Sequence, residues 1–155
     1  MRALSKDLSE FIHLLNQEGV NYLIVGAWAV GFHGRPRYTG DIDIFLRRDS
    51  ENAERMMRVI QLFGFGNVGL TREDFLKRDF IVQLGVEPNR IDILTGISGV
   101  DFALAWEYRV SGSLGGLQVS FISRDLLLQN KRAANRAKDI GDIEILEGTR
   151  PKPSK

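Results

Sequence analysis

The sequence has 155 residues, 43% of them hydrophobic and 26% charged, a balance typical of one globular domain with a buried core and not of a disordered chain. Its formal net charge of +1 argues against a protein that coats duplex nucleic acid, because such binding depends on many Lys and Arg contacts to phosphate. Cysteine is absent, which excludes a disulfide framework, a zinc ribbon and a thiol nucleophile.

The first half of the chain alternates between helical and strand-like patterns. In chain order we predict a helix over 4–15, a strand over 22–25, a helix over 28–32, a strand over 41–46 and a helix over 50–63. Gly26 breaks the first strand, and Ser50 is the expected N-cap of the third helix.

The second half continues with strands over 80–86 and 90–94, a helix over 101–108, two short strands around Gly115-Gly116, and a final helical region that Ser123 caps and that runs to about Leu146. These elements predict an α+β domain with a central mixed β-sheet, flanking helices and a helical C-terminus. We expect residues 1–147 to form this single domain. Residues 148–155 contain prolines and basic residues but nothing apolar, which predicts a flexible basic tail.

Two aspartates in the second predicted strand are the first candidate metal ligands. Because side chains alternate between the faces of a strand, Asp41 and Asp43 project to one face and Ile42 to the other. Like charges about 7 Å apart repel each other unless a cation lies beside them, and oxygen ligands suit Mg²⁺ or Mn²⁺ rather than zinc. Arg90-Ile-Asp-Ile-Leu94 repeats the pattern, so Asp92 is the predicted third ligand if its strand pairs beside the first.

Gly26 follows a strand and precedes a predicted helix. Free backbone N–H groups at a helix N-terminus bind phosphate, and glycine lets the phosphate approach the main chain closely. Gly26 and Ala27 are therefore the predicted phosphate cradle, ahead of Asp41 and Asp43. Nucleotidyl transfer requires this combination, because metals neutralise the phosphate oxygens while the backbone holds the triphosphate.

The order of a hydrophobic residue, Gly26-Ala27, a spacer and then Asp41-Ile-Asp-Ile44 resembles the signature of the polymerase-beta-like nucleotidyltransferase superfamily. Residues 33–41 and 130–142 are similar to motifs of its small single-domain prokaryotic members, some of which belong to toxin–antitoxin pairs. The resemblance implies the nucleotidyltransferase fold, with two metal-binding acids at Asp41 and Asp43. It also implies that Asp92 assists the attacking hydroxyl group.

The function implied is Mg²⁺-dependent transfer of a nucleoside monophosphate from a nucleoside triphosphate such as ATP to an acceptor hydroxyl, with release of pyrophosphate. The acceptor is a small molecule, a tRNA or a protein, and the sequence does not choose among them. Ala27 stands where the signature has Gly or Ser. This departure favours the alternative, a weak or inactive nucleotidyltransferase-fold protein that acts as an antitoxin or as a nucleotide-binding partner module, with a cognate toxin or antitoxin as a possible protein partner. The glycine cradle argues against a nuclease.

Three further side chains, Arg37, Thr39 and Lys131, are candidates for nucleotide binding. Arg37 is either a surface charge or a phosphate ligand. Thr39 either binds a phosphate oxygen or hydrogen-bonds within its loop. Lys131 shares a face of the predicted last helix with Asp139 and Asp142, and it either reaches nucleotide phosphates or forms ion pairs on a solvated face.

Other polar and aromatic residues near the motifs have plainer interpretations. His33 is expected to be a structural hydrogen-bonding residue rather than a ligand, because one histidine offers no metal spacing. Trp28 is expected in the core. The sequence leaves the roles of Arg35 and Arg136 open.

No apolar run approaches the roughly 20 residues that cross a bilayer. The first ten residues carry charges of both signs, unlike a signal peptide. We therefore expect a cytoplasmic protein with no membrane partner.

Overall fold

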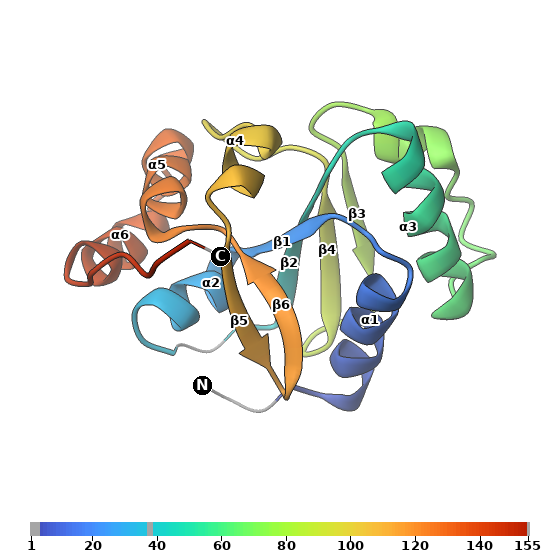
Figure 1. Ribbon diagram of the computed structural model, residues 1–155, viewed down its shortest axis with the longest axis horizontal. Coiled ribbons are helices and arrows are strands. Elements are labelled where there is room, and N and C mark those ends of the chain that lie inside the picture. The colour runs from blue at the N-terminus through green and yellow to red at the C-terminus, as the bar shows by residue number, and fades with distance from the viewer. Residues whose placement is uncertain (1–3, 37–38, 155) are drawn as a thin grey trace.

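A six-stranded sheet forms the centre of the protein, in a computed structural model that describes residues 4–36 and 39–154 (Figure 1). The strands are β1 (Tyr22–Val25), β2 (Asp41–Leu46), β3 (Ile81–Leu84), β4 (Arg90–Leu94), β5 (Val110–Leu114) and β6 (Leu117–Phe121). Their order across the sheet is β3-β4-β2-β1-β6-β5. The pairs β2–β4 and β1–β6 are parallel and the others antiparallel, so the predicted mixed sheet is confirmed.

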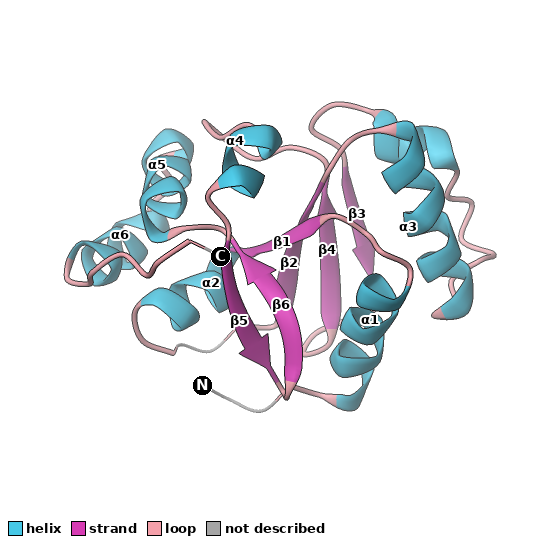
Figure 2. Ribbon diagram, viewed as in Figure 1, coloured by secondary structure: helices cyan, strands magenta, loops and turns pink. Residues whose placement is uncertain are grey.

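Helices cover both faces of this sheet, as the colouring by secondary structure makes clear (Figure 2). They are α1 (Lys6–Gln17), α2 (Gly26–His33), α3 (Ser50–Leu62), α4 (Phe102–Glu107), α5 (Arg124–Ala134) and α6 (Asp139–Glu147), with a 3₁₀ turn η1 (Arg72–Leu76) beside α3. In Figure 1, α1 and α3 lie on one side of the sheet and α2, α5 and α6 on the other.

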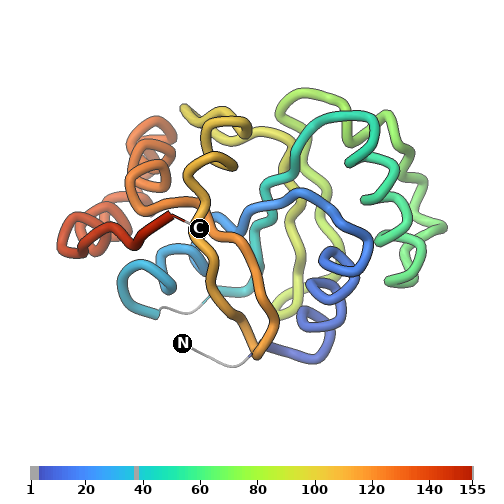
Figure 3. Tube along the Cα trace, in the orientation of Figure 1, coloured from blue at the N-terminus to red at the C-terminus, as the bar shows by residue number. Residues whose placement is uncertain are grey.

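β1 joins two parts of the fold that are distant in sequence. It lies between β2 and β6, so the blue, teal and orange parts of the trace run side by side in Figure 3. Ile24 is the residue of β1 that pairs with both, opposite Ile44 and Phe121, and it is fully buried. The position of β1 explains why its sequence is apolar throughout, since both faces of a central strand are covered.

β2 shows how the alternation of side chains separates the core from the site. Ile42 and Ile44 are buried on one face, whereas Asp41 and Asp43 project to the opposite face and are partly exposed. Phe45 lies on the acid side further along the strand and contacts Phe102 of α4, with ring centroids 5.0 Å apart. The acid-bearing face is therefore the one covered by the C-terminal helices.

The predicted helical region from Ser123 to about Leu146 is confirmed but consists of two helices, so Lys131, Asp139 and Asp142 do not share a face of one continuous helix as expected. Ser123 caps the helix as expected, accepting a hydrogen bond from Leu126 N. Asn135 then adopts a left-handed conformation with φ of +50°, which ends α5. Asparagine tolerates this conformation because its short amide side chain hydrogen-bonds locally. The chain turns and α6 begins at Asp139.

Two smaller boundaries also differ from the prediction. Asp49, not Ser50, is the N-cap of α3, because its carboxylate accepts the hydrogen bond from Asn52 N at 2.8 Å. The helix expected from Trp28 begins two residues earlier, at Gly26. The hairpin prediction is confirmed, with φ of +56° and +82° at Gly115 and Gly116.

The segment after α6 forms no regular helix or strand over residues 149–154. It contacts the domain at two points: Arg124 Nε donates to Thr149 Oγ1 at 3.1 Å, and Lys152 Nζ lies 5.2 Å from the ring centre of Phe32. None of the helices in the described ranges is long and apolar enough to span a bilayer.

Replacing the buried Asn52 by alanine tests how the end of β2 is held. Its side chain accepts from Asn21 N at 2.8 Å and donates to Asn21 O at 3.0 Å and Arg47 O at 2.8 Å. Asn52→Ala removes all three hydrogen bonds, and Asn21 O alone keeps a second partner, Arg47 N at 3.2 Å. We therefore expect the free energy of unfolding in urea to fall by about 2 kcal/mol or more. Asn130→Ala removes one exposed hydrogen bond, to Ser98 O, and should cost less than about 1 kcal/mol. Equal losses of unfolding free energy in the two variants would contradict the role given to Asn52 at the end of β2.

Candidate functional site

Three carboxylates converge on the acid-bearing face of the sheet. β2 and β4 pair in parallel with Asp43 directly opposite Asp92, which confirms the pairing predicted for these strands. One oxygen each from Asp41, Asp43 and Asp92 lies within 4.8 Å of the others. This donor set fits a hard divalent cation such as Mg²⁺ or Mn²⁺, which prefers carboxylate oxygens.

The clustering changes the acid–base behaviour of the central carboxylate. Burial, followed by the negative charges of Asp41 and Asp92, raises the pKa of Asp43 to about 7. The positive charges of Lys131 and Lys138 act in the opposite direction. At neutral pH and without a bound cation, ionisation of Asp43 in the folded protein therefore costs free energy.

Arg90 is part of the site, and the sequence analysis missed it. Its Nε donates to Asp92 Oδ1 at 2.9 Å and its Nη2 donates to Asp41 Oδ2 at 2.5 Å. Its guanidinium group therefore offsets part of the charge of two of the three acids. The signal was present in the sequence, because the alternation that placed Asp92 on this face places Arg90 there too.

Gly26 is needed for the close packing of β1 against the site. Its φ of +67° is in the left-handed region, and a Cβ atom would lie 2.0 Å from Asp43 Oδ2. Ala27 follows in the first turn of α2 and is buried. Because the first N–H groups of a helix have no intrahelical partner, this N-terminus presents donors beside Asp43.

Two neighbours orient Asp41. Thr39 Oγ1 accepts a hydrogen bond from Asp41 N at 3.3 Å and lies 3.1 Å from Asp41 Oδ1. Trp28, which is buried as expected, donates from Nε1 to Asp41 O at 3.2 Å. The hydrogen bonds of Thr39 thus stay within its loop in this structure. Arg37, the other candidate in that loop, lies outside the described residues.

Lys131 lies in a buried ion cluster between α5 and α6. Its Nζ is 3.4 Å from Asp139 Oδ1 and 3.1 Å from Asp142 Oδ2, and all three residues are at most 4% exposed. The turn at Asn135 brings them together, rather than the face of one helix. Although burial alone raises the pKa of Asp139, hydrogen bonds from Arg136 and the charge of Lys131 lower it overall.

The remaining polar candidates are His33, Arg136 and Arg35, and the hydrogen bonds and ion pairs of the first two involve groups other than the three acids. His33 is buried and its Nε2 donates to Ile122 O at 2.7 Å, which confirms a structural role. Burial lowers its pKa. Arg136 is paired with Asp139, from Nε to Oδ2 at 3.0 Å. Arg35 is exposed in the loop after α2.

Comparison with known proteins identifies the fold. No family model matches the chain, and no curated protein matches it by sequence. The chain is similar to the crystal structure of the lincosamide antibiotic adenylyltransferase LnuA bound to lincomycin, with a TM-score of 0.58 and 17% identity. The match covers 96% of this chain and 99% of that chain. The chain therefore has the nucleotidyltransferase fold, and the predicted fold class is confirmed. At 17% identity the match shows the fold alone, and it gives no support to the toxin–antitoxin subtype.

Substitution of Gly26 tests the close contact with Asp43. In Gly26→Ala the new methyl group must displace the carboxylate, so we expect Mn²⁺ affinity in calorimetric titration to fall by about tenfold or more. Gly69→Ala is the matched control, because Gly69 has a similar φ of +82° and open space around its Cβ position. Unchanged Mn²⁺ affinity in Gly26→Ala, or an equal loss in both variants, would show that the contact is unimportant for metal binding.

The raised pKa of Asp43 predicts a pH-dependent stability in EDTA. In the unfolded chain this carboxyl titrates near 4, so the folded state loses stability as the pH rises from about 4 to about 7. Asp43→Asn removes that loss and should raise the Tm by roughly 5 °C at pH 8 but not at pH 4. Asp7→Asn, an exposed control, should show no such trend. A Tm difference that does not grow with pH would contradict the raised pKa.

Proposed function

We propose that the protein transfers a nucleoside monophosphate from a nucleoside triphosphate to the hydroxyl group of an acceptor. The observation that carries this proposal is the convergence of Asp41, Asp43 and Asp92 beside the N-terminus of α2. Carboxylates that bind divalent cations and backbone donors that bind phosphate are the two elements that nucleotidyl transfer needs.

In the proposed reaction, the oxygen of the acceptor hydroxyl forms a bond to the α-phosphorus, and the bond from that phosphorus to the β-phosphate bridging oxygen breaks. Pyrophosphate leaves with the electron pair of that bond. The N–H groups of Gly26 and Ala27 hold the triphosphate, and Asp92 accepts the proton of the acceptor hydroxyl. The three aspartates would hold Mg²⁺, which would neutralise charge on the phosphate oxygens.

The match to LnuA spans nearly the whole of both chains. LnuA is described as an adenylyltransferase, and the match covers 99% of its chain. A separate acceptor-binding domain is therefore not a requirement of the activity on this fold. This supports the enzyme over the non-catalytic alternative, although Ala27 replaces the expected Gly or Ser.

A second candidate is a nucleotide-binding protein without transfer activity. The observation that favours it is Arg90, whose guanidinium already pairs with Asp41 and Asp92. Such an internal cation competes with a metal ion for the same oxygens. A module of this kind acts through a partner protein, for which a cognate toxin or antitoxin is the proposed class.

The deciding experiment is incubation with each α-labelled nucleoside triphosphate, Mg²⁺ and a cell extract as the source of acceptors. We expect label transfer that EDTA abolishes and that Asp43→Ala reduces by at least about 100-fold. Asp125→Ala, at an exposed carboxylate on α5, is the control and should transfer label normally.

Binding measurements separate the two candidates. Metal-dependent nucleotide binding without label transfer would support the second candidate and contradict the first. Absence of both transfer and binding would reject both.

A further inference from the structure

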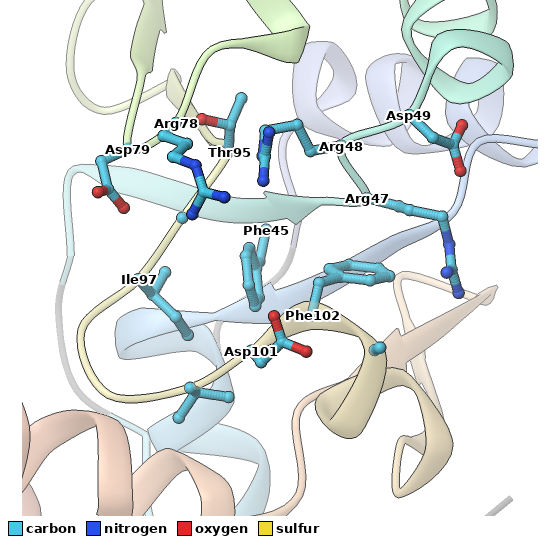
Figure 4. Close-up of a pocket in the computed structure, with 13 residues that line it drawn as sticks. Phe45, Arg47, Arg48, Asp49, Arg78, Asp79, Thr95, Ile97, Asp101 and Phe102 are labelled. Atoms are coloured by element: carbon cyan, nitrogen blue, oxygen red, sulfur yellow. The ribbon is translucent and has the colours of Figure 1, made fainter.

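A cavity of about 340 Å³ lies at the carboxyl ends of β2 and β4 (Figure 4). Phe45 lines it, and because Phe45 follows Asp43 by two residues, both side chains lie on the same face of β2 about 7 Å apart. None of the three aspartates lines the cavity. A molecule bound there would lie beside Phe45, which is two residues along β2 from Asp43 of the proposed reaction centre.

Arginines without carboxylate partners line this cavity. Within residues 4–36 and 39–154, no ion pair joins Arg47, Arg48 or Arg78 to an acidic group. Arg48 Nη1 donates only to Leu76 O, at 3.2 Å. Arg47 lies 4.9 Å from the ring centre of Phe102, and its Nε is buried without a hydrogen-bond partner in the described structure. Guanidinium groups gathered at a cavity in this way fit a carboxylate or phosphate group.

The rest of the lining fits a polyhydroxylated molecule. In Figure 4, Arg48 and Arg78 extend toward the middle of the view, where Asp101 and the ring of Phe45 also lie. Asp79 contributes a second carboxylate. It packs so closely against Gly96 that a Cβ atom on that glycine would lie 2.3 Å from Asp79 Oδ1. Carboxylates accept hydrogen bonds from hydroxyl groups but repel a ligand that is only an anion. The volume is that of a site for one small molecule.

We propose that this cavity binds the acceptor, and that the acceptor is a small polyhydroxylated anion such as a sugar phosphate or a sugar acid. Its anionic group binds Arg48 and Arg78, and its hydroxyl groups donate to Asp79 and Asp101. The role of the bound molecule as acceptor rests on the proposed transferase function, whereas the binding of such an anion does not depend on it.

Binding is tested by calorimetric titration without nucleotide or metal, using four probes. Glucose 6-phosphate and gluconate carry the anionic group, glucose is neutral and glucosamine is cationic. We expect each anionic probe to bind at least about tenfold more tightly than glucose or glucosamine. Equal or tighter binding of glucosamine, or no binding of either anionic probe, would overturn the proposal.

Variants locate the binding. Arg48→Gln combined with Arg78→Gln should weaken binding of the anionic probe by at least about tenfold. Arg78→Gln alone removes no hydrogen bond or ion pair of the described structure. It therefore keeps the test valid if the double variant is unstable. We expect this single variant to weaken binding about fivefold. Arg58→Gln is the control, because Arg58 lies on α3 across the sheet and pairs with Glu18. Unchanged binding in the cavity variants would overturn the proposal.

The acceptor role has a separate readout. The cavity variants should lose label transfer while keeping the Mn²⁺ and nucleotide affinities of the unmodified protein. If the anionic probes bind but no label is ever transferred, the anion site stands and the transferase function fails. If label transfer to extract acceptors is the same in the cavity variants, the transferase function stands and this cavity is not the acceptor site.

Discussion

Electrostatic repulsion among three carboxylates is the constraint around which the site is built. Asp41, Asp43 and Asp92 bring like charges within 4.8 Å of one another on a half-buried sheet face, where water screens them less than at an open surface. The protein offsets this repulsion with Arg90 and with the more distant charge of Lys131. Burial, together with the repulsion that remains, keeps the pKa of Asp43 raised to about 7. A divalent cation bound by the three carboxylates would reduce this repulsion.

The arrangement of the strands places the groups of the site in a row along one sheet face. β1 ends opposite Asp43, so the chain enters α2 at Gly26 directly beside the acids. In the other direction β2 continues to Phe45 and the arginine-lined cavity. The proposed phosphate donors, the acids and the proposed acceptor cavity thus follow one another along a single sheet face. This order matches the order of groups in the reaction, with the triphosphate at one end and the acceptor at the other.

The C-terminal helices and the turn between them bring the positive charges of Lys131 and Lys138 to the site. Their connection is stabilised by the buried cluster of Lys131 with Asp139 and Asp142, in which each charge has a partner. A buried lysine without partners would lose its proton or unfold its surroundings, so the two aspartates are what allow a positive charge this close to the acids. The cluster connects the stability of the α5–α6 turn to the electrostatic potential at Asp43.

The sequence by itself determined the elements whose cause is local. The alternation in Asp41-Ile-Asp-Ile44 placed both acids on one face, Gly26 marked the strand-to-helix junction, and Gly115-Gly116 marked the hairpin. Tertiary structure decided the rest, because it depends on contacts between distant segments. Periodicity alone could not reveal that Asn135 would break the last helix or that Lys131 would face inward. The ion pairs of Arg90 and the arginine-lined cavity arise only when β2, β4 and the loops that follow them are packed together.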